Sequence, residues 1–319
     1  MAIDLVLFFL GFMLLIKGAS LLIDGAVSIA RFWNMSPWTI GVVIVGIGTS
    51  IPEFSINIAS ALSGGSVGIG AVIGSNIFNI LFILGIVSFL TPVVMNKVWV
   101  WKDFTVNIIA ILISAGFFLF PVLGPEKSIG ISHREGIVLL VSFFVWLWYM
   151  LRRTRSVPEM KTDYKAFTLT VSFVMILVGF IGVFFGGEWV VNGAEKLALF
   201  FGVNEGLVGL IIVGIGTSVP ELAVSITAAV KGRSAIAVGN IIGSNIFDFL
   251  GIFGVVSLFG PLRLPSELVW PLVFALVTTL ILFFVMILGK NYTLSRKEGV
   301  FFIFLYLGYI AFLFSSLTV

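Results

Sequence analysis

The chain contains one eight-residue segment twice, with a single change between the copies. GIGTSIPE at Gly46–Glu53 returns as GIGTSVPE at Gly214–Glu221. A second matched pair follows the two copies, GSNIFN at Gly74–Asn79 and GSNIFD at Gly243–Asp248. Because the motifs recur in the same order, we expect a fold made of two copies of one unit, with a site between the copies.

Long apolar runs place these motifs in membrane-spanning segments. The 319 residues are 60% hydrophobic and 10% charged, with a mean hydropathy of +1.21. No soluble domain of this size can bury so much apolar surface, and one bilayer span needs about 20 apolar residues. We therefore expect an all-α integral membrane protein in a lipid bilayer. Ten transmembrane helices are predicted near residues 4–30, 36–62, 66–91, 103–121, 134–151, 166–198, 203–230, 234–260, 267–289 and 298–317.

The polar stretch at 152–165 divides the expected spans into two halves of five, residues 1–151 and 166–319. Since five is odd, the halves would enter the membrane from opposite sides, which makes them inverted repeats. Basic residues favour inner loops. With both termini outside and 152–165 as a cytoplasmic linker, thirteen Lys and Arg residues fall inside and four outside. The inner set is Arg31, Lys97, Lys102, Arg152, Arg153, Arg155, Lys161, Lys165, Lys231, Arg233, Lys290, Arg296 and Lys297; the outer set is Lys127, Arg134, Lys196 and Arg263.

Composition also limits the partners and the chemistry. The pI of about 9.2 comes from these loop residues and does not indicate a nucleic-acid partner. Cysteine is absent, which excludes disulfides and thiolate metal sites. The first apolar run continues as a span instead of ending at a signal-peptide cleavage site. Asp24 and Glu188 lie near the ends of long, tilted spans, and we expect interfacial or helix-pairing roles for them.

Each eight-residue motif should interrupt the helix that carries it. Pro52 has no N–H to donate to the carbonyl of Gly48, and Gly46 loosens the same turn. Pro220 and Gly214 repeat the arrangement. Carbonyl oxygens freed at membrane depth are tolerated only where they face protein, water or a bound ion, and matched interruptions in two halves indicate a transport site.

The polar side chains of the motifs share helix faces, because residues four apart lie on one face. Inverted halves would bring these faces together near the bilayer midplane as a cluster of oxygens. Such a cluster suits hard cations such as calcium and sodium, and does not suit zinc or copper. An acidic residue at this depth costs about 2.5–3.5 kcal/mol, so cations or protons must neutralise the group. The pairs are Thr49 with Glu53, Thr217 with Glu221, Ser75 with Asn79, and Ser244 with Asp248.

At these motifs the chain resembles the sodium/calcium exchangers of the cation/calcium antiporter superfamily. Their repeats carry G-T-S-x-P-E and G-S-N-x-x-[N/D], and the short linker is similar to that of a prokaryotic member. The resemblance implies that Glu53 and Glu221 bind calcium with the carbonyls of Thr49 and Thr217. It implies sodium sites at both glutamates and at Gly46, Ser50, Ser75, Asn79, Gly214, Ser218, Ser244 and Asp248.

The resemblance also implies an antiporter, not an enzyme, that exchanges about three sodium ions for one calcium ion by alternating access. We expect no cofactor beyond the transported ions, no requirement for an oligomer, and a location in a prokaryotic plasma membrane. Three alternatives stay open: calcium/proton exchange, potassium-dependent exchange, and a passive cation channel.

Overall fold

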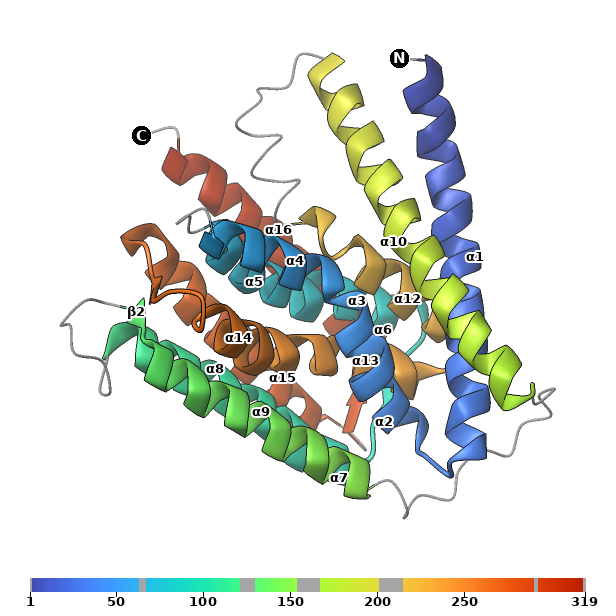
Figure 1. Ribbon diagram of the computed structural model, residues 1–319, viewed down its shortest axis with the longest axis horizontal. Coiled ribbons are helices and arrows are strands. Elements are labelled where there is room, and N and C mark those ends of the chain that lie inside the picture. The colour runs from blue at the N-terminus through green and yellow to red at the C-terminus, as the bar shows by residue number, and fades with distance from the viewer. Residues whose placement is uncertain are drawn as a thin grey trace.

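The protein is mostly helical, and two of its helices are much longer than the rest (Figure 1). The computed structural model describes residues 2–62, 67–120, 130–153, 167–200, 215–289 and 292–317. In the first half these form α1 (Ala2–Phe32), α2 (Pro37–Ile40), η1 (Gly41–Gly46), α3 (Ile47–Thr49), α4 (Ile51–Leu62), α5 (Val67–Phe78), η2 (Asn79–Ile83), α6 (Leu84–Leu90), β1 (Val93–Val94), α7 (Lys97–Trp99), η3 (Val100–Phe104), α8 (Thr105–Leu119), β2 (Gly130–Ile131) and α9 (His133–Arg153).

The second half follows a similar order. Its elements are α10 (Leu169–Phe200), α12 (Val219–Val230), α13 (Ser234–Ile246), η5 (Phe247–Ile252), α14 (Phe253–Val256), β3 (Leu262–Arg263), η6 (Ser266–Leu268), α15 (Val269–Leu288), β4 (Thr293–Leu294) and α16 (Arg296–Leu317). The segments η1, η2, η3 and η5 are π-helical turns that continue the neighbouring α-helices, and η6 is a short 3₁₀ helix.

Among the described residues, seven helices are long and apolar enough to cross a bilayer. Pro37–Thr49 and Ile51–Leu62 form an eighth candidate if the two are counted as one span, bent by 42°. The bend confirms the predicted interruption beside Pro52. The ten-span count stays a prediction, since 201–214 lie outside the described residues and α12 alone is too short to cross.

One span begins earlier than expected. The sequence places the start of the fourth span at 103, but the helix runs from Lys97 through η3 to Leu119. The sequence assigns Lys97 and Lys102 to an inner loop, but both are exposed side chains on this helix, which continues through Asp103. In the structure this carboxylate is buried and accepts a 2.7 Å hydrogen bond from the indole Nε1 of Trp38, which satisfies it inside the protein.

Two helical segments form the centre of the molecule. The spans Val67–Leu90 and Ser234–Val256 are 78% and 94% buried, whereas α1 and α10 are largely exposed on their outer faces. A surface that is hydrophobic all round belongs in a protein core or in lipid. The segments that carry the GSN motifs therefore lie inside a shell formed by the other helices.

Short strands and helices of one half pair with those of the other half. β1 pairs with β4 and β2 pairs with β3, both antiparallel, so each two-stranded sheet takes one strand from each half. In the same way α9 packs against α14, and α16 packs against α6. α9 and α16 begin alike, because Glu135 accepts from the backbone N–H of Ser132 and Glu298 accepts from that of Ser295.

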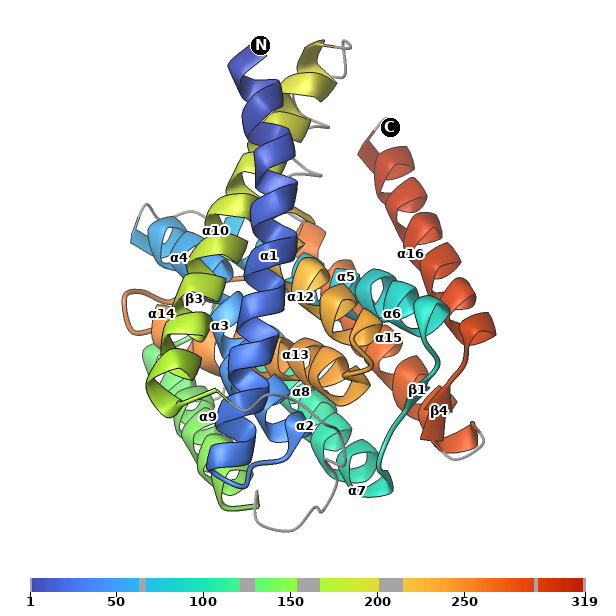
Figure 2. The same ribbon diagram turned by 90° about the vertical axis from the view of Figure 1, so that its right-hand side faces the viewer.

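The long helices α1 and α10 lie side by side and extend beyond the other helices (Figures 1 and 2). Glycines allow their backbones to touch. A Cβ placed on Gly18 would lie 2.7 Å from the backbone nitrogen of Val183, and a Cβ on Gly179 would lie 2.6 Å from that of Leu22. Close approach of this kind is the usual use of small residues between membrane helices.

Gly18→Ala and Gly179→Ala should each destabilise the protein, because the new methyl group would push the two backbones apart. Overpacking of this kind costs about 1–3 kcal/mol. The melting temperature of the purified protein in detergent measures the effect. Gly116→Ala is the matched control, since a Cβ there meets nothing within 4 Å. Equal melting temperatures for all three variants would contradict the tight α1–α10 contact.

Candidate ion-binding site

The two eight-residue motifs lie at matching breaks in their helices. The first break falls at Ser50, between α3 and α4, and the second at Thr217 and Ser218, just before α12. A helix follows each break, and its first turn carries a glutamate: Glu53 in α4 and Glu221 in α12. The carboxyl groups are therefore held close to the positive ends of helix dipoles, where negative charge is favoured.

Serines from one half bond glutamates from the other. The hydroxyl of Ser50 donates to Oε1 of Glu221 at 3.3 Å, and the hydroxyl of Ser218 donates to Oε1 of Glu53 at 3.5 Å. Both glutamates are 1% exposed. These reciprocal contacts place the two copies of the motif against each other at a single buried site.

The GSN motifs join the same cluster. The side-chain amide of Asn76 donates to Oδ2 of Asp248 at 2.8 Å, and Ser75 donates to the same oxygen at 3.4 Å. Asn79 donates to Oδ1 of Asn245 at 3.0 Å. Asp248 and Asn79 lie at equivalent positions of the two motifs, both within π-helical turns, which are frequent at functional sites.

The backbone of Gly46 lies directly against α13. A Cβ on Gly46 would lie 2.9 Å from the oxygen of Asn240 and from the nitrogen of Ser244, so only glycine fits here without a shift. The hydroxyl of Ser244 donates to the carbonyl of Gly46 at 3.0 Å, and that of Thr49 approaches the same carbonyl at 3.3 Å. The equivalent glycine of the second half, Gly214, lies outside the described residues.

Six buried side-chain oxygens of the cluster have no hydrogen-bond partner among the described residues. Each carboxyl group uses one oxygen in a hydrogen bond and leaves the other without a partner. Buried polar atoms are normally satisfied, and a buried charge needs a compensating charge. The three carboxyl groups therefore call for protons or cations, and the neutral oxygens beside them can accept hydrogen bonds or contact a cation. The six oxygens are Oε2 of Glu53 and Glu221, Oδ1 of Asp248, Asn76 and Asn79, and Oγ1 of Thr217.

These oxygens favour hard cations, and the unpartnered nitrogen of the cluster among the described residues, Nδ2 of Asn245, is an amide that donates hydrogen bonds and does not bind metal. Within the described part of the chain, no group of three or more Asp, Glu, His or Cys side chains forms a metal site by itself. A cation bound here would therefore take hydroxyl, amide and carbonyl oxygens along with carboxylates. Mixed oxygen ligands of this kind are what calcium and sodium accept.

Sequence reasoning missed the asparagines that support the cluster. Asn240 is completely buried and accepts from the hydroxyl of Thr49 at 3.0 Å. Its amide donates to Ser225 at 2.9 Å and to the backbone carbonyl of Glu221 at 3.3 Å. A comparison of the two halves does not identify Asn240, because the equivalent position in the first half is Ala71. Its spacing of four residues from Ser244 is the signal that could have identified it.

In the first half, a different residue donates a hydrogen bond to the equivalent backbone carbonyl, that of Glu53. There the side chain of Asn57, on the same helix as Glu53, donates to the carbonyl of Glu53 at 2.8 Å. The supporting amide thus comes from α4 in one half and from α13 in the other. One consequence is that Thr217, the counterpart of Thr49, has a hydroxyl without a partner among the described residues.

These features define the class of the protein: a multi-pass helical membrane protein with a buried cluster of side-chain oxygens between its halves. Comparisons with known proteins agree. The sequence profile of the family described as "Sodium/calcium exchanger protein" matches residues 3–152 and 171–315. The chain belongs to this family, whose members are transporters and not enzymes.

Two relatives and one solved structure match along nearly the whole chain. An uncharacterized membrane protein of Methanocaldococcus jannaschii is 34% identical, over 95% of this chain and 96% of that protein. The putative antiporter CaxA of Alkalimonas amylolytica is 32% identical, over 96% and 97%. A structure of the sodium-calcium exchanger NCX_Mj, soaked with Na⁺ and Sr²⁺, superposes with a TM-score of 0.83 at 31% identity, covering 98% of this chain and 99% of that one.

Asn240→Leu should lower the melting temperature clearly, because it removes the partners of Thr49, Ser225 and the Glu221 carbonyl. Leaving a buried polar group without a hydrogen-bond partner lowers the free energy of unfolding by about 1–3 kcal/mol for each group. Asn107→Leu is the matched control: this amide is also completely buried, but neither of its polar atoms has a hydrogen-bond partner among the described residues. We expect Asn107→Leu to leave stability unchanged or to raise it. Similar losses in the two variants would contradict the supporting role of Asn240.

Proposed function

We propose that the protein exchanges sodium for calcium across the membrane by alternating access. The observation that carries the proposal is the reciprocal pairing of Ser50 with Glu221 and of Ser218 with Glu53, which makes one buried acidic site from both halves. Membership of the exchanger family and the match to NCX_Mj support antiport of calcium against another cation. A site that both halves share can be opened to either side of the membrane by moving one part against the rest.

Within this site, we assign calcium to Glu53 and Glu221, with the backbone carbonyls of Thr49 and Thr217. Both glutamates have a carboxylate oxygen without a partner in the described part of the chain, which supports this assignment. The sodium ligands that we propose are the two glutamates with Gly46, Ser50, Ser75, Asn79, Gly214, Ser218, Ser244 and Asp248. Sodium and calcium would then compete for overlapping oxygens, so that the site always carries positive charge.

The halves of the protein are proposed to be inverted repeats, residues 1–151 and 166–319, joined by a linker at 152–165. The exchange of strands supports this view, because β1 and β3 follow equivalent helices and each pairs with a strand of the other half. The packing of α9 on α14 and of α16 on α6 follows the same rule. A two-fold axis in the membrane plane relates such elements when the halves enter the membrane from opposite sides.

We propose that α1 and α10 move together against the central helices during transport. The two helices pack along each other through glycines and extend away from the rest of the molecule (Figure 2). Exchange of about three sodium ions for one calcium ion would move one net charge in each cycle. That step is worth about 2.3 kcal/mol per 100 mV, so the membrane potential would drive calcium export.

The proposed orientation places both termini outside a prokaryotic plasma membrane. The start of α1 and the end of α16 lie toward the same end of the molecule, which supports an even number of spans (Figures 1 and 2). The basic residues of the inner loops set the direction. The protein works as a single chain in this scheme, because both halves of the site come from one molecule.

Calcium uptake into vesicles that contain the purified protein tests the exchange. An outward sodium gradient should drive uptake, while a proton gradient or a potassium gradient alone should not. An inside-positive potential should change the rate, because the cycle moves charge. Uptake that follows the proton gradient would favour calcium/proton exchange, and a requirement for potassium would favour potassium-dependent exchange. Uptake without any countertransported ion would indicate a channel.

Glu53→Gln and Glu221→Gln should each abolish sodium-driven calcium uptake, because each removes one of the two carboxylates assigned to calcium. The measurement is uptake into vesicles at matched protein content, and the expected rate is that of empty vesicles. Glu188→Gln is the control, since this glutamate is exposed on α10 and should leave uptake unchanged. Near-normal exchange in either site variant would refute the proposed calcium site.

A further inference from the structure

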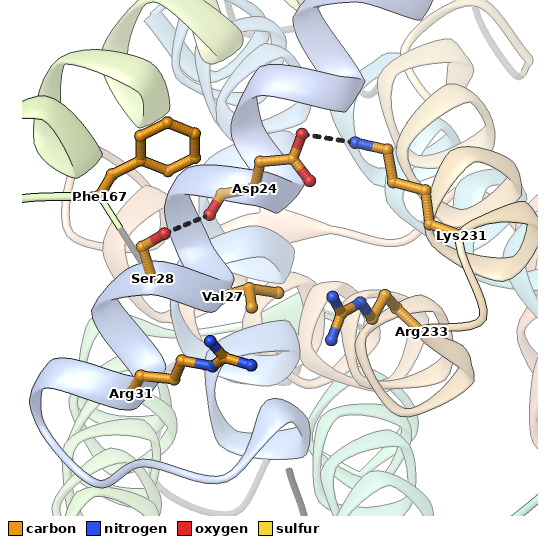
Figure 3. A pocket seen from close by; sticks show the side chains of 7 residues that line it. All are labelled: Asp24, Val27, Ser28, Arg31, Phe167, Lys231 and Arg233. Atoms are coloured by element: carbon orange, nitrogen blue, oxygen red, sulfur yellow. Dashed lines mark hydrogen bonds and ion pairs between the residues drawn. The ribbon is translucent and has the colours of Figure 1, made fainter. Parts of the chain in front are cut away.

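Three hydrogen bonds connect the end of α12 to α1, near the end of α1 that is predicted to face the cytoplasm. The ammonium group of Lys231 forms an ion pair with Asp24 at 2.7 Å, as expected for a helix-pairing residue (Figure 3). It also donates to the hydroxyl and the carbonyl of Ser20, at 2.6 and 3.1 Å. An ammonium group has three N–H donors. Each donor of Lys231 therefore has an acceptor, and all three acceptors lie on α1.

The backbone of the turn between α12 and α13 fixes the position of Lys231, which caps the end of α12. Gly232 follows in a left-handed conformation with φ of +70°, which favours glycine. The N–H of Arg233 donates to the carbonyl of Ala228 at 2.7 Å, and that of Gly232 donates to Ala229 at 2.9 Å. This pattern is a Schellman motif, so the side chain of Lys231 starts from a fixed point beside the buried segment Ser234–Val256.

The contact links α1 to a helix of the candidate ion-binding site. α12 is 12 residues long, with Glu221 in its first turn and Lys231 directly after its last residue, and α1 packs against it. Hydrogen bonds of this kind need a donor–acceptor distance of about 3 Å. Because the three acceptors of Lys231 are all on α1, a movement of α1 against the central helices has to stretch or break the three bonds.

The other half of the chain has no equivalent of this ion pair in its sequence. Gly18 and Asp24 of α1 correspond to Gly186 and Asn192 of α10, and the segment 63–66 that follows α4 reads SGGS, without Lys or Arg. The helix contacts differ in the same way. α1 packs against α12, whereas among the described residues α10 makes no comparable contact with α4, and its far end extends away from α4 (Figures 1 and 2).

We propose that Lys231, Ser20 and Asp24 form a latch that favours the conformation seen here, with α1 against α12, over the opposite one, with α10 against α4. The inference rests on the proposed function, because it requires α1 and α10 to move together. For inverted repeats the two conformations use equivalent helix contacts, so the side chains that differ between the halves set the balance. The side chains of Lys231 and Asp24 are 28% and 38% exposed, so salt screens the pair in part and the latch does not block the movement.

Double electron–electron resonance on the full chain in detergent tests the latch. The chain has no cysteine, so Leu62→Cys and Ala194→Cys place spin labels only near the exposed ends of α4 and α10, away from the latch. Without further changes we expect mainly one long distance between the labels. Asp24→Asn and Lys231→Gln should each raise the fraction of a shorter distance about fivefold. Lys297→Gln removes an exposed charge elsewhere on the proposed inner side and should leave the distribution unchanged.

Two further measurements separate a latch from general damage to the structure. Added choline chloride should raise the short-distance fraction in the unaltered latch and have no effect in Asp24→Asn, because the charge pair that salt screens is then absent. Exchange of the two charges, Asp24→Lys with Lys231→Asp, should restore part of the original distribution.

Equal distributions in Asp24→Asn, Lys231→Gln and Lys297→Gln would overturn the proposal, as would a response to salt that persists in Asp24→Asn. The distances are measured without transport, whereas exchange is tested by sodium-driven calcium uptake. Loss of uptake in the unaltered protein would count against the exchange, and unchanged distances with intact uptake would count against the latch, so the two failures can be told apart.

Discussion

Buried carboxylates without enough hydrogen-bond donors are the constraint on which the rest of the structure depends. Glu53 and Glu221 lie inside an apolar protein, and in each case a serine of the other half bonds only one of the two carboxylate oxygens. Burying charge in this way is costly unless a counter-charge is present. A protein that keeps such groups between its halves has an interior that is stable only when it holds cations or protons, and that property is what an exchanger of cations requires.

The scaffold is organised so that these groups can meet. Glycine at Gly46 lets the first broken helix lie directly on α13, and π-helical turns reshape the central helices at Asn79 and Asp248. Asn240 then ties Thr49 of one half to Glu221 of the other.

The repeated motifs allowed much of the site to be predicted from the sequence. Ser50 bonds Glu221, Ser218 bonds Glu53 and Ser75 bonds Asp248, so residues of the two halves meet as the repeated motifs predicted. Their roles as ion ligands remain predictions. Asn240 was not foreseen, because it has no polar counterpart in the other half. The early start of the fourth span was missed because Lys97 and Lys102 place two charges in its first turns, which is typical of a loop in sequence.

A crystal structure of the protein soaked with strontium, located by its anomalous scattering, tests the central claim most directly. Strontium is a heavier substitute for calcium with the same preference for oxygen ligands. We predict one buried peak within bonding distance of carboxylate oxygens from both Glu53 and Glu221. A peak bound by one half alone, or a map in which the two carboxyl groups point away from each other toward lipid, would contradict the account.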